Sequence, residues 1–178
     1  PNTVTYVNGT SATSQNPVIQ FNALGAYDVT LVATNAIGSN TLTKTAFVAA
    51  TNGIAVPVTQ DFEVGFPGVD WSIENPDQLN SWVQSTSVTG ATGTPTLAAS
   101  MDNFNYNAQG QEDFLYMPTM NLTGQTSAAL KFDLAYARYS IAFADGLRVE
   151  LSTDCGTSYT ILYDESGTDL ATVSDQTQ

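Results

Sequence analysis

Carboxylates are the most numerous groups in this chain that could carry chemistry. The 178 residues include 17 Asp and Glu against 4 Lys and Arg, which gives a net charge of -13 at pH 7. Carboxylate and amide oxygens are the ligands that hard cations such as Ca²⁺ prefer. An acidic excess also occurs simply as a solvated surface. The composition therefore indicates either a solvated acidic surface or carboxylates gathered around a hard cation.

The absence of histidine removes several kinds of chemistry at once. Without it the chain cannot build a Ser-His-Asp triad or a His-ligated zinc site. Cys155 is the one cysteine, so it forms no internal disulfide and has no histidine base to activate it. The few basic residues cannot neutralise nucleic-acid phosphates, so we expect no nucleic-acid partner. No apolar run approaches the ~20 residues of a membrane span.

One short segment spaces its side-chain oxygens like a calcium loop. Asn103, Asn105 and Asn107 occupy positions 1, 3 and 5 of an EF-hand loop counted from Asn103. The sixth position is Ala108 instead of Gly, and the twelfth is Phe114 instead of Glu. The segment fails both tests, so it predicts a turn or an exposed alternating strand.

Catalytic signatures are missing from the sequence. There is no nucleophile elbow, phosphate loop or dinucleotide fingerprint. Glu112 and Asp113 form an acidic pair, but neighbours on a strand point to opposite faces and cannot flank one glycosidic bond. Sugar-stacking aromatics are the other candidates, although we expect the two tryptophans to pack in the core. These aromatics are Trp71, Trp82, Tyr106, Tyr116 and Tyr136.

The elements that must position these residues are predicted to be strands. From Gly25 to Leu31, apolar side chains recur at every second residue, which is typical of a strand with one buried face. Residues 35–40 then supply a turn, and residues 41–48 form a second β-rich run. A short strand is expected at residues 3–7, with a turn at Asn8-Gly9 after it.

The rest of the chain shows the same alternation in several places. Residues 130–136, 147–151 and 159–163 each read as a strand, and helical periodicity is weak everywhere. Two packed sheets are the economical way to bury such one-faced strands. We therefore predict an all-β fold.

The first strands resemble a known extracellular family. Gly25-x-Tyr27-x-Val29-x-Leu31, followed by Asn and a Gly turn, resembles the C-terminal half of a PKD (polycystic kidney disease) domain. The resemblance implies a partial Ig-like sandwich over residues 1–50 and a linker over 51–58. The opening strands of such a domain are expected to lie outside this chain.

Residues 59–178 carry an ordered set of motifs. They are Asp61-Phe-Glu63, Trp71, Trp82, Asp113-Phe-Leu-Tyr, Leu130-x-Phe132 and Asp145-Gly-Leu147-x-Val149. The set resembles the cleaved-adhesin or MAM-like jelly-roll domain of secreted Bacteroidetes proteins, here expected to lack its final strands. The pairing with a PKD domain is similar to the C-terminal region of pappalysin-type metallopeptidases and of surface adhesins exported by type IX secretion.

This resemblance implies a structural Ca²⁺ in the jelly roll. The family pattern gives Glu63 and Asp145 as ligands, with Asp102, Asn103 and Asp113 as candidates to complete the shell. The alternative is that Glu63 and Asp145 only cap strand ends or lie in turns.

We expect, on this basis, a non-catalytic accessory or adhesion segment of a large extracellular or cell-surface bacterial protein. Its partners would be the missing segments of the same parent or other chains of a surface or secretion complex, with a glycan or protein as ligand. The alternatives are a carbohydrate-binding module of a secreted hydrolase, and a structural stalk or export cargo held by secretion machinery.

Overall fold

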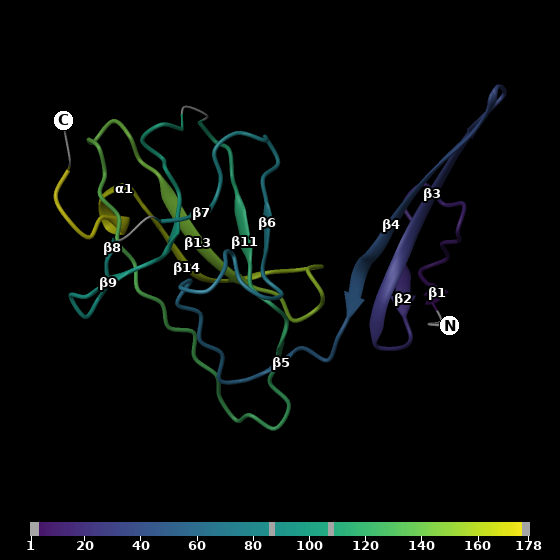
Figure 1. The fold of residues 1–178 in the computed structure, drawn as a ribbon, viewed down its shortest axis with the longest axis horizontal. Coiled ribbons are helices and arrows are strands. Elements are labelled where there is room, and N and C mark those ends of the chain that lie inside the picture. The colour runs from purple at the N-terminus through teal and green to yellow at the C-terminus, as the bar shows by residue number, and fades with distance from the viewer. Residues whose placement is uncertain (1–3, 86–87, 107–108, 176–178) are drawn as a thin grey trace. The chain divides into compact units, whose positions relative to one another are not determined.

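The computed structural model describes residues 4–85, 88–106 and 109–175 (Figure 1). Its regular structure is almost entirely β-strand, and the one helix in these ranges is the four-residue α1 (Gly167–Leu170). The predicted all-β class is therefore confirmed. The chain divides into two compact units, one of residues up to 58 with 118–125, and the other of residues 59–117 with those from 126 onward.

A long antiparallel hairpin dominates the first unit. Strand β3 (Gly25–Asn35) pairs with β4 (Gly38–Ala50), as the alternation in the sequence predicted. Asn35 closes the turn, because its side-chain Oδ1 accepts hydrogen bonds from the backbone N–H of Ile37 (2.8 Å) and of Gly38 (3.1 Å). Asn is favoured at such turns because its short side chain can replace backbone partners.

A bulge interrupts the hairpin near its base. Tyr27 pairs with Val48, but Val29 pairs with Lys44, so β4 carries extra residues at this point. Ala46 adopts a positive φ of 52° there, and its N–H donates to Asp28 Oδ1 at 2.7 Å. The Asp28 carboxylate thus satisfies a backbone donor that the shifted ladder leaves without a cross-strand partner.

The buried part of this unit lies at the base of the hairpin. Tyr27 is only 7% exposed, its hydroxyl donates to the Ala23 carbonyl at 2.6 Å, and its ring meets Phe21 edge-to-face at 4.6 Å. Phe21 belongs to β2 (Ile19–Phe21), which pairs with β1 (Val4–Tyr6). Asn8 and Gly9 turn the chain with positive φ angles, as predicted.

The segment predicted as a linker contains a short strand. Within residues 51–58, β5 (Ile54–Ala55) pairs in parallel with β12 (Met120–Asn121). Gly53 precedes β5, and a Cβ at this position would lie only 2.8 Å from the Thr119 carbonyl oxygen. Glycine therefore permits the close approach of the two backbones.

The second unit is made of antiparallel pairs. The strand β13 (Gly146–Leu151) pairs with β14 (Thr160–Ser166), which confirms the strands predicted at 147–151 and 159–163. Three shorter pairs accompany them. These are β6 (Ser72–Glu74) with β11 (Phe114–Tyr116), β7 (Val83–Gln84) with β10 (Ala99–Ser100), and β8 (Val88–Thr89) with β9 (Pro95–Thr96).

The strand predicted at residues 130–136 is wrong, because this segment is irregular in the structure. Tyr136 bonds instead to Thr172: its N–H donates to Thr172 Oγ1 (3.0 Å), and its carbonyl accepts from the Thr172 N–H (2.9 Å). In the described part of the chain each sheet has two strands. The sandwich types expected for the two units therefore stay predictions.

Candidate functional site

The first predicted calcium ligand, Glu63, is engaged by its own protein. Its Oε1 accepts hydrogen bonds from the Thr96 hydroxyl (2.5 Å) and from the Leu97 N–H (2.8 Å). These two donors hold the pKa of Glu63 below its usual value. The carboxylate therefore joins the loop at residues 61–66 to the end of β9.

The next two predicted ligands, Asp102 and Asn103, lie in a turn. Asp102 accepts from the Asn105 side chain at 2.8 Å and from the Asn105 N–H at 3.2 Å, and these bonds lower its pKa. The Asn103 carbonyl accepts from the Tyr106 N–H at 3.3 Å. The turn alternative predicted for this segment is thus confirmed as far as Tyr106; Asn107 and Ala108 lie outside the described residues.

Asp145 lies just before β13. Its Oδ2 accepts from the Tyr136 hydroxyl at 2.8 Å, and its carbonyl accepts from the Gly167 N–H at 2.9 Å. Partial burial, followed by this hydrogen bond, raises the pKa of Tyr136. In this structure Asp145 ties the irregular segment around Tyr136 to the start of α1.

Asp113 differs from the other three carboxylates in its surroundings. Its backbone carbonyl accepts from the Trp82 indole N–H at 3.1 Å, and its Oδ2 lies 3.4 Å from the Tyr106 hydroxyl. Its Oδ1 is enclosed and has no hydrogen-bond partner. The Tyr106 hydroxyl also donates to Asp77 at 2.5 Å, and this bond raises the pKa of the phenol well above its usual value.

The structure does not gather the predicted ligands into one shell. Among the described residues, no three His, Cys, Asp or Glu side chains form a group arranged to hold a metal ion. Glu63, Asp102 and Asp145 each accept hydrogen bonds from separate local donors. Calcium binding by these residues stays a prediction.

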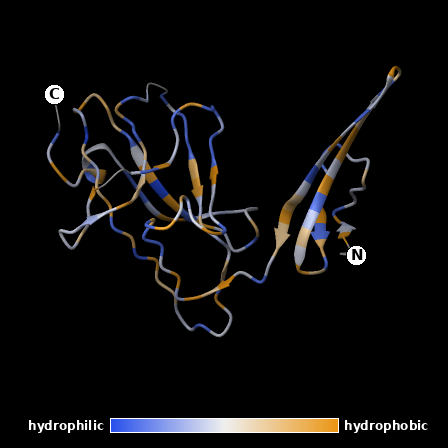
Figure 2. Cartoon of the chain, in the orientation of Figure 1, coloured by the Kyte–Doolittle hydropathy of each residue, from blue (hydrophilic) through white to orange (hydrophobic). Residues whose placement is uncertain are grey.

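The hairpin presents a second candidate site, an exposed apolar face on which the Lys44 ammonium lies over the Phe47 ring, 4.5 Å from its centroid. We define the ribbon face as Val29, Leu31, Leu42 and Phe47, which line a depression of about 240 Å³ together with Lys44. Leu31 is 66% exposed, and Leu42 and Phe47 are nearly as open. Figure 2 shows hydrophobic and hydrophilic residues mixed along both strands.

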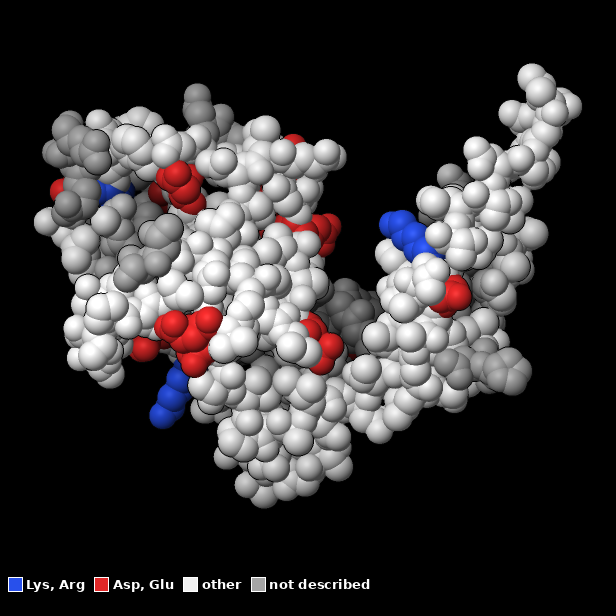
Figure 3. Space-filling view, viewed as in Figure 1, with Lys and Arg blue, Asp and Glu red and all other residues white. Residues whose placement is uncertain are grey.

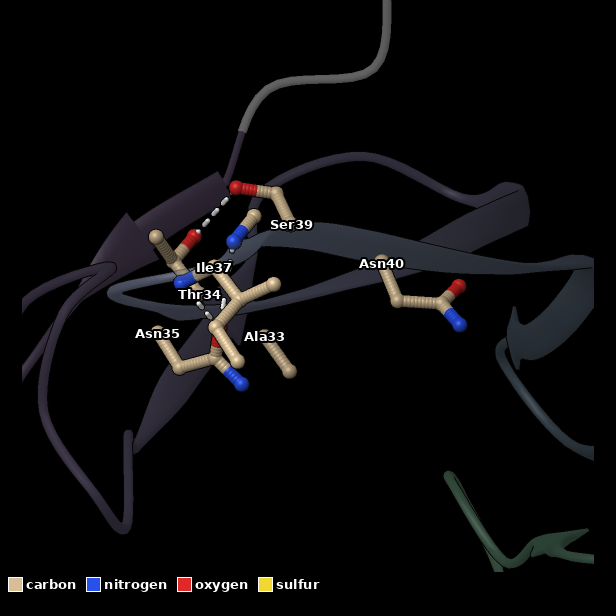
Figure 4. Close-up of a pocket in the computed structure, with 7 residues that line it drawn as sticks. Ala33, Thr34, Asn35, Ile37, Ser39 and Asn40 are labelled. Carbon is tan, nitrogen blue, oxygen red and sulfur yellow. Dashed lines mark hydrogen bonds between the residues drawn. The ribbon is translucent and has the colours of Figure 1, made fainter.

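The opposite side of the hairpin is lined mainly by hydroxyls. Thr30 and Thr43 form a cross-strand hydrogen bond at 3.0 Å, and Thr34 and Ser39 form another at 2.8 Å. A shallow hollow of about 420 Å³ lies at the tip, where the Thr34–Ser39 bond and the Asn35 turn are drawn (Figure 4). The hairpin therefore has one apolar and one mainly polar side, as a sheet that packs on one face does.

The aromatic residues divide into packed and exposed groups. Trp71 and Trp82 are half-buried, and the Trp71 ring meets Phe62 edge-to-face at 5.6 Å. By contrast, Phe104 and Phe143 are 64% and 57% exposed, and both contact the Tyr139 ring edge-to-face. Sequence reasoning missed this trio, in which two exposed phenylalanines nearly forty residues apart contact a half-buried tyrosine.

Sequence reasoning also missed Asp77, which accepts from the Tyr106 hydroxyl that lies near Asp113, and Asn75, whose Oδ1 is likewise enclosed without a partner. The one local signal was the polar run Glu74-Asn75-Pro76-Asp77 at the end of β6. Its relation to Asp113 depends on the pairing of β6 with β11. No protein-family model, curated protein or solved structure matches this chain.

Proposed function

We propose that this chain is a non-catalytic accessory or adhesion segment of a large secreted or cell-surface bacterial protein, and that it works by binding another β-rich surface. The observation that carries the proposal is the exposed ribbon face on β3 and β4. Exposed contiguous apolar surface of this kind is typical of sites that another protein segment covers.

Covering the ribbon face would contribute a favourable free energy of burial. Burial of a Leu or Phe side chain contributes about 1.5–3 kcal/mol relative to full exposure. Leu31, Leu42 and Phe47 are each more than half exposed, so a cover over the three would contribute several kcal/mol before the cost of association. A second sheet packs naturally on such a face, because stacked sheets interdigitate at a spacing of about 10 Å.

The total surface of the chain supports the same proposal. The chain exposes 13495 Å². Two separate compact bodies of this total size would expose only about 10,000 Å². The excess, about 3,500 Å², is larger than the roughly 1,000–2,500 Å² that one partner contributes to the permanent interfaces of obligate complexes, which bury about 2,000–5,000 Å² in total. We infer that the partner is another segment of the parent polypeptide or a further chain of the same surface complex.

Charge limits the kind of partner. Acidic side chains lie in separate patches on the face drawn in Figure 3, and basic ones are few. A net charge of -13 repels nucleic acid and anionic membrane surfaces. Over the described ranges, the structure contains no helix of the length and apolarity that a membrane crossing requires. From the charge we propose a neutral or basic protein partner.

A structural Ca²⁺ is a further part of the proposal. It is supported by the surplus of hard oxygen donors, since carboxylate, amide and hydroxyl oxygens are the ligands that Ca²⁺ takes. The ion would stabilise the second unit rather than take part in a reaction.

Analytical ultracentrifugation of the chain, alone and mixed with the adjoining segments of its parent, tests the binding proposal. Leu31→Asp places a charge on the ribbon face and should abolish association. Val32→Asp is the matched control, because Val32 is 56% exposed on the opposite side of the same strand. Equal effects of both variants, or no association of the unmodified chain with any of these segments, would contradict the proposal.

A carbohydrate-binding role is the second candidate function. It is favoured by the Phe104, Tyr139 and Phe143 trio, whose open rings could stack on sugars. Sedimentation of the chain with insoluble polysaccharides would test it. Loss of binding in Phe104→Ala, with retention in Leu31→Asp, is the result that this role predicts.

A further inference from the structure

The net negative charge of the chain lies entirely in its second unit. The first unit, residues 1–58 with 118–125, contains one acidic side chain, Asp28, and one basic side chain, Lys44. Of the 17 acidic and 4 basic residues, all but this one of each belong to the second unit. The ribbon face is therefore part of a unit whose side chains sum to zero charge, and its electrostatics depend on Asp28 and Lys44.

Lys44 lies on the ribbon face itself. In the hairpin, Lys44 faces Val29, and two residues further along Leu42 faces Leu31. Facing residues of an antiparallel pair point to the same side, and so do residues two apart on one strand. The Lys44 ammonium lies over the Phe47 ring, 4.5 Å from its centroid. A cation is thus placed within the apolar face, among the side chains that line its depression.

The first unit has no second charge to pair with this ammonium. The Asp28 carboxylate accepts the Ala46 N–H at 2.7 Å, at the bulge. The ion pairs of the described residues join Arg138 to Asp175 and Arg148 to Asp164, both in the second unit. Lys44 is exposed in the free chain, so water solvates its charge. A cover over the ribbon face removes that water, and a desolvated charge then needs a counter-charge.

We propose that the partner covering the ribbon face presents one carboxylate to Lys44 from an otherwise apolar sheet. The inference rests on the proposed function and adds the chemistry of the partner surface. Apolar partner side chains would cover Leu31 and Leu42, about 7 Å further along the strands, since two residues of a strand span that length. One such carboxylate is compatible with a partner that is neutral or basic as a whole.

A second copy of this chain does not fit the same requirement. Its ribbon face would bring another Lys44 and no acidic side chain, because the four apolar residues of the face carry no charge. Two ammonium groups would then share one desolvated contact, and like charges placed opposite each other destabilise a pairing. The matching surface is therefore a different one, with an Asp or Glu at the Lys44 position.

Lys44→Met tests the proposal through the sign of its effect on binding. The methionine keeps the unbranched stem and its packing on the Phe47 ring, but removes the charge. Calorimetric titration of the full chain with the adjoining segments of its parent gives the affinity. The variant leaves the partner carboxylate unpaired, so binding should weaken at least about thirtyfold, as after loss of one member of a buried charge pair. If Lys44→Met binds as tightly as wild type, or more tightly, the partner surface is apolar and the proposal is overturned.

Thr43→Met is the matched control for this variant. Thr43 is the next residue on β4 and bonds across the strands to Thr30 on the hydroxyl side, at 3.0 Å. It should bind like the unmodified chain. The melting temperature of the free Lys44→Met chain should equal that of wild type, because Lys44 is exposed. A Thr43→Met loss as large as that of Lys44→Met would show that the hairpin had changed, and would count against the assignment.

Carbodiimide coupling tests the same contact without relying on affinity. The reagent activates a carboxylate, a touching amine displaces the urea, and an amide bond joins the two. The chain has two lysines, Lys44 and Lys131, so mass spectrometry assigns the product directly. Lys44 should couple to an Asp or Glu of the bound segment, and Leu31→Asp, which prevents association, should abolish the product.

The outcomes separate this inference from the wider proposal. A link from Lys44 to a second copy of this chain, or an associated complex without any Lys44 link, overturns the carboxylate while binding at the ribbon face stands. If the chain associates with none of the segments, the proposed function fails and this inference fails with it.

Discussion

Replacing Leu31 by alanine should cost the free chain little, and this prediction tests the exposed ribbon face most directly. Leu31 is 66% exposed, so about one third of its surface is out of water. Full burial of a Leu contributes about 1.5–3 kcal/mol, so the expected loss is about 0.5–1 kcal/mol. Tyr27 is 7% exposed, and Tyr27→Ala should cost about 3–5 kcal/mol, as other large aromatic truncations do.

Hydrogen exchange of the amides of β3 and β4 provides the measurement, because it reports the free energy of opening of this hairpin by itself. Tyr27→Phe is the intermediate case. It keeps the ring on Phe21 and removes the 2.6 Å bond to Ala23, so it should cost about 1 kcal/mol. A Leu31→Ala loss as large as that of Tyr27→Ala would mean that the face is already covered in the free chain. With the partner bound, Leu31→Ala should instead cost about 2–5 kcal/mol, as in other cores.

Three further predictions concern the second unit. Hydrogen bonds from the Ser158 hydroxyl and N–H and from the Ser152 hydroxyl lower the pKa of Asp154 to about 2. This contribution to stability should be complete above pH 4 and fall away between about pH 4 and 2, and NMR titration of Asp154 would check it. Arg138 holds the C-terminal segment through two hydrogen bonds to Asp175 and one to Thr168. Arg138→Ala should therefore speed proteolysis after residue 166. Arg148→Ala, which breaks an exposed ion pair with Asp164, should not. Burial and a hydrogen bond to Glu74 raise the pKa of Tyr116 to about 12. An ultraviolet titration of the tyrosines should therefore lose a component near pH 12 in Tyr116→Phe. The Tyr6→Phe control should keep that component.

Local patterns predicted those elements whose partners lie nearby in the chain. The hairpin of β3 and β4 follows from the alternation at residues 25–31, the Asn and Gly turn and the β-rich run after it, and β13 and β14 follow from the alternation at 147–151 and the run at 159–163. Residues 130–136 alternate equally well but form no strand. Alternation specifies which side chains share a face, whereas a strand also needs a neighbouring backbone to complete its hydrogen bonds. In the described residues the Tyr136 backbone bonds to Thr172 instead of to a neighbouring strand.

The candidate site residues were predictable only in part. Asp113 was expected as a ligand from the family resemblance, but the surroundings of Asn75 and Asp77 were not expected. Asp77 and Asp113 reach the same Tyr106 hydroxyl from distant segments of the chain, and nothing in the local sequence specifies that approach.

Charge composition connects the two proposals. A chain with 4 basic residues cannot give each enclosed carboxylate an internal cation, and both arginines already form ion pairs with other acids. The half-buried Asp113 carboxylate has no basic partner among the ion pairs of the described residues. The ribbon face also lacks a partner. Among the described residues, its apolar side chains lie on one side of the hairpin and stay exposed. Stability that depends on an ion and on a partner rises with their concentrations, by about 2.7 kcal/mol for each ligand at a hundredfold excess over its Kd. We therefore expect a segment that is most stable where calcium and its partner are both abundant, as at a bacterial surface.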